Sequence, residues 1–128
     1  MSGLRFVLRP ESFCIHRLPP DRHVDTARFA AASWYSITRT DDELSVVAPA
    51  DIDLGPGDRE AGWSCLQIAG KLDFAMVGVI AGISRALAEA NVSLFAISTY
   101  DTDYFLVKTA DIEAAAHALT AAGHSVSA

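Results

Sequence analysis

The segment "AISTYDTDYFLV", Ala96 to Val107, alternates apolar and polar residues on both sides of a polar turn. Alternation of this kind indicates two strands, each with one buried face. The turn holds an unbroken row of hydroxyl and carboxylate side chains: Ser98, Thr99, Tyr100, Asp101, Thr102 and Asp103. Such residues are common in turns because they hydrogen-bond to nearby backbone. The row is therefore either a polar turn alone or the edge of a binding site.

Regular patterns on both sides of this hairpin extend the prediction to a whole domain. Residues 63–69 read as a strand, and residues 94–100 and 104–109 as the hairpin. An apolar stripe with helical spacing predicts a helix over 75–90; it consists of Met76, Ile80, Ile83, Leu87 and Ala90. Asp111 is a candidate cap for a second helix running to about Ala122, and "HSVSA" fits a final edge strand. The order βαββαβ predicts an antiparallel sheet with both helices on one face.

The first half of the chain looks like a degenerate copy of the second. Residues 36–52 align without a gap under residues 96–112, and six of the seventeen positions are identical. Both segments predict hairpins of the same length, with strands over 33–39 and 44–48 in the first copy. Where the second copy continues into a helix, the first has Gly55, Pro56 and Gly57, which oppose a helix interior. We therefore predict tandem α+β ferredoxin-like halves, over 1–60 and 61–128, packed as one unit.

Composition sets limits on the function. The chain has 128 residues, of which 51% are hydrophobic and 20% charged, and a net charge of -6. These values fit a globular protein and argue against nucleic acid as a partner, because binding phosphates requires clustered basic residues. No apolar run approaches a membrane span, and the N-terminal residues lack a signal core. A cytoplasmic protein is expected.

Signatures of catalysis or metal binding are sparse in the sequence. Cys14 and Cys65 form no metal-binding pair and fit buried free thiols, while the four histidines lack metal-ligand spacing. No catalytic residue, metal or cofactor is predicted. One enzymatic alternative stays open, in which Asp103 or Asp101 acts as acid or base with help from Tyr100. A scaffold that uses its hairpins only for contacts is a third possibility.

The order of elements brings two complementary groups into reach of each other. The first turn of the long helix exposes unpaired backbone N–H groups and the positive end of the helix dipole, which suit a carboxylate. An aspartate across from them suits an amine or guanidinium. Together they would match a zwitterion such as an amino acid.

The second half resembles an ACT domain, a small βαββαβ regulatory module, and is similar in particular to the CASTOR-like branch of bacterial proteins and animal cytosolic arginine sensors. The resemblance rests on "ISTYDTDYFLV" (97–107) and on "LDFAMVGVIAGISRALAEANVS" (72–93). In the first half, "SITRTDDELSVV" (36–47) is similar to the partner repeat of that branch. The resemblance covers nearly the whole chain.

This resemblance implies a non-catalytic sensor that binds a small amino acid between paired ACT units. The ligand-binding positions that it implies are Thr99, Tyr100, Asp103, Gly78 and Val79. Asp73 occupies a loop position where the arginine sensors have glycine, which places a side chain where the family's backbone approaches the ligand. Because the animal sensors carry four units per chain and this chain has two, the resemblance also implies a homodimer.

Overall fold

The computed structural model describes residues 3–73 and 76–128. The chain divides into two compact units. The outer unit combines Met1–Pro10 with Trp63–Ala128, and the central unit comprises Glu11–Gly62. The division differs from the predicted halves, 1–60 and 61–128, because the first ten residues join the second half. The reason is strand pairing: β1 (Arg5–Leu8) pairs with strands of the outer unit on both of its edges.

The outer unit contains a sheet in the order β6-β7-β5-β1-β8. Its other strands are β5 (Asp58–Ile68), β6 (Phe95–Ser98), β7 (Asp103–Lys108) and β8 (Ser125–Ser127). β8 runs parallel to β1, and the other pairs are antiparallel. The predicted strands over 63–69, 94–100 and 104–109 and the final edge strand are confirmed. β5 begins five residues earlier than predicted. These five residues are exposed and show no apolar alternation, so the sequence pattern did not indicate that they belong to the strand.

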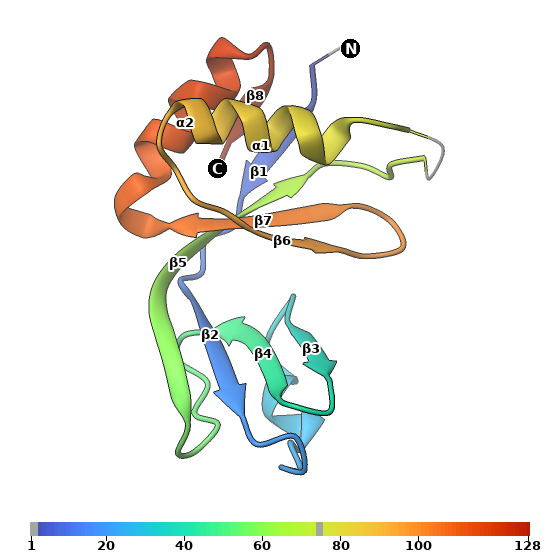
Figure 1. Cartoon of the computed structure of the whole chain (residues 1–128), viewed down its shortest axis with the longest axis vertical. Helices are drawn as coiled ribbons and strands as arrows, with labels where there is room; N and C mark the ends of the chain where they lie inside the picture. The colour runs from blue at the N-terminus through green and yellow to red at the C-terminus, as the bar shows by residue number, and fades with distance from the viewer. Residues whose placement is uncertain (1–2, 74–75) are drawn as a thin grey trace. The chain divides into compact units, whose positions relative to one another are not determined.

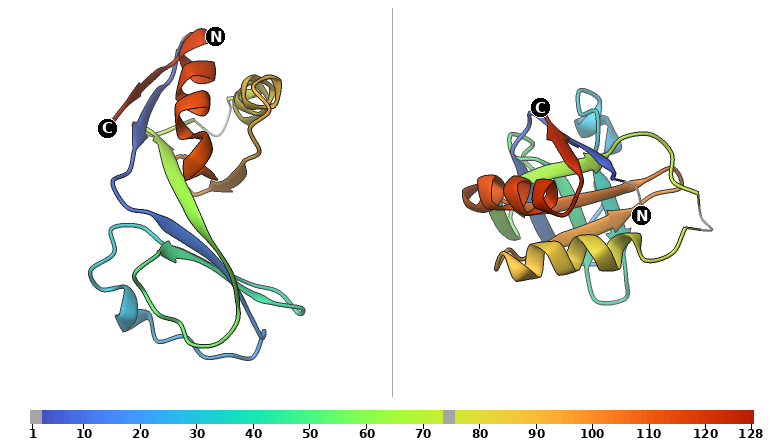
Figure 2. Two further views of the ribbon diagram at one scale, coloured as in Figure 1. Left: turned by 90° about the vertical axis from the view of Figure 1, so that its left-hand side faces the viewer. Right: turned by 90° about the horizontal axis from the view of Figure 1, so that it is seen from above.

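Two helices, α1 (Val79–Glu89) and α2 (Ile112–Ala121), lie side by side on one face of this sheet (Figures 1 and 2). Their inward residues pack on alternate residues of β5 and β7, as the strand period requires. The core includes Leu66, Phe105, Ile83, Leu87, Ala115 and Leu119, each at most 1% exposed. The predicted α+β fold, with helices on one face, is confirmed.

The start of α1 differs from the predicted helix over 75–90. Ala75 lies outside the described residues, while Met76 is not helical and donates its backbone N–H to the carbonyl of Asp73. Gly78 has φ +79°, a left-handed conformation that interrupts the helical backbone and that glycine adopts most easily. The helix therefore begins at Val79. As a consequence, Met76 belongs to the loop before the helix.

The start of α2 also corrects one detail. Asp111 occupies the capping position, but its side chain makes no capping hydrogen bond. The preceding residues form a short 3-10 turn, η2 (Thr109–Asp111), and Asp111 lacks the extended backbone that a capping side chain requires.

The central unit contains β2 (Phe13–Leu18), β3 (Ser36–Arg39) and β4 (Leu44–Pro49) in the antiparallel order β3-β4-β2. The predicted hairpin of the first half is thus present, and no helix occupies 51–62. A 3-10 turn, η1 (Thr26–Phe29), replaces the long helix of the other unit. The core is formed by Leu18, Phe29, Leu44, Val46, Ala48 and Leu54. Both cysteines are buried and free, as predicted.

His16 is a buried titratable group of the central unit. It is 4% exposed, and its Nε2 has no hydrogen-bond partner among the described residues. Burial lowers the pKa of His16 from its ordinary 6.5, and the nearby Arg59 lowers it further, while Asp53 opposes the change. The imidazole is consequently held neutral in the folded chain.

This burial predicts a loss of stability in mild acid. Below about pH 6.5 the unfolded chain binds the His16 proton before the folded chain does, so the free energy of unfolding falls as the pH falls. One proton limits this slope to about 1.4 kcal/mol per pH unit. Urea unfolding of wild type and His16→Leu between pH 7.5 and 5 should show a shallower slope in the variant. His23→Gln, at an exposed histidine, is the control and should keep the wild-type slope. Identical slopes in all three proteins would contradict the prediction.

Candidate functional site

The turn between β6 and β7 is held by its own threonines. The Thr99 backbone N–H donates to the Thr102 carbonyl at 2.9 Å, and the Thr99 hydroxyl donates to the same carbonyl at 3.1 Å. The Thr102 hydroxyl donates to the Ile68 carbonyl at 3.0 Å, which fastens the turn to the end of β5. Thr102 is 5% exposed, so this hydrogen bond is shielded from water. These hydrogen bonds hold the turn in one conformation and attach it to β5.

The loop between β5 and α1 is hydrogen-bonded to this turn. The Leu72 backbone N–H donates to the Asp101 carbonyl at 2.7 Å. At the other end of the loop, the left-handed backbone of Gly78 leads into α1, and a Cβ added there would meet no other atom within 4 Å. The first turn of α1 and the hairpin turn lie close enough together to line one cavity.

A cavity of about 330 Å³ lies between the hairpin turn and the first turn of α1. The six predicted ligand-binding residues all line it: Asp73, Gly78, Val79, Thr99, Tyr100 and Asp103. The lining is completed by Leu72, Met76, Ile80, Ala81, Ser98, Asp101 and Thr102. The structure therefore brings the predicted residues together around one space, large enough for a molecule of amino-acid size.

The charges around the cavity are unevenly distributed. Three aspartates line it, and its described lining includes no lysine or arginine. Lys71 lies 3.9 Å from the Asp101 carboxylate, but both side chains are more than half exposed, so water screens this pair. The positive charge of the lining comes from the start of α1, whose first backbone N–H groups have no helical acceptor. An anionic group fits the helix start, and a cationic group fits the aspartates.

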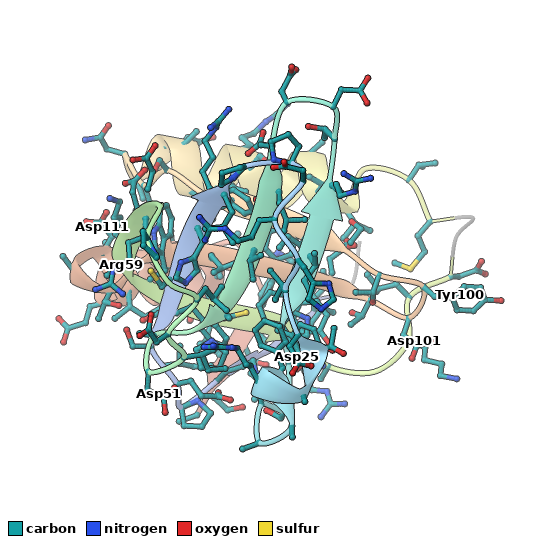
Figure 3. The ribbon with its side chains drawn as sticks, turned by 90° about the horizontal axis from the view of Figure 1, so that it is seen from below. Asp25, Asp51, Arg59, Tyr100, Asp101 and Asp111 are labelled. Atoms are coloured by element: carbon teal, nitrogen blue, oxygen red, sulfur yellow. The ribbon has the colours of Figure 1, made fainter. Side chains whose placement is uncertain are left out.

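The individual side chains differ in how well they can reach a ligand. Asp103 is half-buried and pairs with Ser98 across the hairpin, on the face that carries Phe105 and the helices. The hydroxyl of Thr99 is already used inside the turn, so it has only accepting capacity left. Tyr100 is 81% exposed and its ring extends away from the hairpin (Figure 3). Asp103 is consequently the best-placed carboxylate.

Some lining residues were not predicted from the sequence. Thr102 fixes the turn through an acceptor, Ile68, that lies far away in sequence, and no local pattern signals such a bond. Met76 and Ile80 were assigned to the buried stripe of the helix, but each is 41% exposed. The helical spacing of these apolar residues indicated an apolar helix face, but it did not show whether that face packs in the core or lines a cavity. They make one wall of the cavity apolar.

Other chemistry of the described residues lies apart from this cavity. Burial raises the pKa of Tyr104, whose register position places it on the sheet face opposite Asp103. The described residues include no group of three or more histidine, cysteine, aspartate or glutamate side chains able to hold a metal ion. No helix in the described ranges is long and apolar enough to cross a membrane.

The arrangement defines a class: a βαββαβ module with a ligand-sized cavity at the start of its first helix. A family model described as an ACT domain matches residues 58–121, half of the chain. A crystal structure of an Agobacterium tumefaciens protein is 32% identical, with a TM-score of 0.88 over 98% of this chain and 93% of that one. The chain belongs to the ACT domain family.

More distant structures share the fold. A Vibrio cholerae protein is 18% identical, with a TM-score of 0.72 over 94% of this chain and 91% of that one. The ligand-free regulatory subunit of aspartate kinase from Thermus thermophilus is 13% identical, with a TM-score of 0.64 over 91% of this chain and 95% of that one. No curated protein matches the chain. The tandem arrangement is thus shared with a regulatory subunit of a kinase.

Proposed function

We propose that this chain is a cytoplasmic, non-catalytic regulatory protein of the CASTOR-like branch that binds an amino acid in the cavity at the start of α1. One observation supports the proposal: the half-buried Asp103 and the first turn of α1, whose first N–H groups have no helical acceptor, line the same cavity. An amino acid carries the opposite charges in the same arrangement. The helix start would bind its carboxylate, and Asp103 its ammonium group.

The remaining lining favours a ligand with an extended side chain. Asp73 adds negative charge beyond that required by one ammonium group, while Met76 and Ile80 supply apolar contact. Asp73 also occupies volume near the helix start. A side chain with an apolar stem and a polar or cationic end is consistent with this lining.

Two other functions make different predictions. An enzyme using Asp103 or Asp101 with Tyr100 would convert the bound compound, but the Tyr100 ring is 81% exposed and extends away from the hairpin that carries both aspartates. A scaffold would bind no small molecule. Incubating the protein with each standard amino acid, followed by mass spectrometry, separates sensor from enzyme because a sensor returns the compound unchanged.

We also propose that the chain forms a homodimer. Two copies would supply the four units that the animal sensors of this branch carry in one chain. The chain shares its fold with the regulatory subunit of aspartate kinase, which is consistent with a regulatory role.

A further inference from the structure

The two helices of the outer unit carry matching stripes of small residues along a shared groove. The small residues at α1 are Gly82, Ala86 and Ala90, and the charged Arg85 and Glu89 line the groove between them, at helical spacings of three and one. α2 contributes His117 and four alanines at the same spacings, and the groove encloses about 480 Å³. Because the small residues project little, another pair of helices could approach this helix-face groove closely. None of its residues lines the ligand cavity.

Two opposite charges in the lining of the groove have no partner among the described residues. Arg85 and Glu89 are one helical turn apart, yet within the described ranges neither forms an ion pair or hydrogen bond. Arg preceding Glu is the weaker orientation for a pair on one helix. Glu89 is also the last residue of α1, where the helix dipole is negative and no basic residue is nearby in the last turn. Both charges are therefore available to a partner.

The charges of Arg85 and Glu89 are complementary to the same two charges in a second copy of the chain. A two-fold axis crossing α1 between these charges makes the α1 helices of two copies antiparallel. It then places each Arg85 opposite Glu89 of the second copy, so the symmetric contact contains two ion pairs. Alanine and glycine on both copies allow the helices between these pairs to pack closely.

We infer that the helix-face groove is the contact of the proposed homodimer and that its occupant is the same groove of a second copy. The inference rests on the proposed homodimer and identifies the surface through which the two copies contact each other. It is independent of amino-acid binding, because the cavity at the start of α1 is lined by other residues. The two sites can therefore be disrupted independently.

Sedimentation equilibrium of the full chain tests this assignment by exchange of the charges. Arg85→Glu and Glu89→Arg each place like charges opposite each other twice, so each should raise the dimer dissociation constant about tenfold or more. The double variant Arg85→Glu/Glu89→Arg restores opposite charges and should return the constant to within about threefold of wild type. Arg5→Glu, at an exposed arginine outside the groove, is the control and should leave the constant unchanged.

The possible results test the existence of the homodimer separately from the contact face assigned to it. A wild-type chain that stays monomeric at high micromolar concentration would overturn both the homodimer and the face assigned to it. A dimer that ignores the single charge reversals, or that the double variant fails to restore, would overturn only the face. Binding of a different protein in the groove would give the same monomeric wild type and so also counts against the inference. Thermal shifts by amino acids should persist in all these variants.

Discussion

Replacing Asp103 by asparagine should weaken amino-acid binding roughly 10- to 150-fold. Asparagine keeps the shape of the side chain but removes the charge from a hydrogen bond that is worth about 1.5–3 kcal/mol when charge-assisted, and each ~1.4 kcal/mol is tenfold in affinity. The half-buried position of Asp103 on the helix side of the hairpin is the structural reason. Calorimetric titration with an amino acid that stabilises the wild type measures the change.

A matched control lies in the same turn. Asp101 also lines the cavity, but it is exposed and lies near Lys71, so Asp101→Asn should change affinity by less than about threefold. Without ligand, both variants should unfold within about 0.5 kcal/mol of wild type. If Asp103→Asn binds as tightly as wild type, the hairpin is a polar turn and contributes no ligand carboxylate.

Truncating Leu87 should give a large loss of stability. Leu87 is 0% exposed and packs in the core between α1 and the sheet. Leu87→Ala removes buried methyl groups and leaves a cavity, which costs about 2–5 kcal/mol. Ile80→Ala on the same helix should cost less than about 1.5 kcal/mol, because Ile80 is 41% exposed.

Denaturant unfolding of both variants checks this difference. The sequence places Ile80 and Leu87 in one apolar stripe, whereas the structure assigns Leu87 to the core and Ile80 to the cavity wall. Equal losses in the two variants would mean that α1 packs with a different face against the sheet.

The sequence was most informative where one periodicity ran without interruption. The hairpin and the later part of α1 were predicted correctly because alternation and the 3.6-residue period dominate their local patterns. The start of α1 was not, because the left-handed backbone of Gly78 depends on the loop that ends there. The pairing of β1 with β5 and β8 is a long-range choice that no local pattern encodes.

In the candidate site, too, the features with a local sequence pattern were predicted and those that depend on long-range contacts were not. Its residue types and their order along the chain pointed to a helix start and a polar turn as the two sides of a site. The geometry added what the sequence lacked: the buried hydroxyl of Thr102 that fixes the turn, and the loop bond from Leu72 to Asp101 that joins the two sides. The family resemblance in the sequence favoured Asp103 over Asp101, and the burial and register of Asp103 add a physical reason for that choice.

A thermal-shift screen of the wild-type chain against the standard amino acids tests whether the chain binds an amino acid. A ligand present at about 100 times its dissociation constant stabilises the folded state by about 2.7 kcal/mol, which raises Tm by several degrees in a chain of this size. We expect such a rise with at least one amino acid, and a smaller rise in Asp103→Asn under the same conditions. If no amino acid changes Tm at millimolar concentration, the chain is not an amino-acid-binding protein.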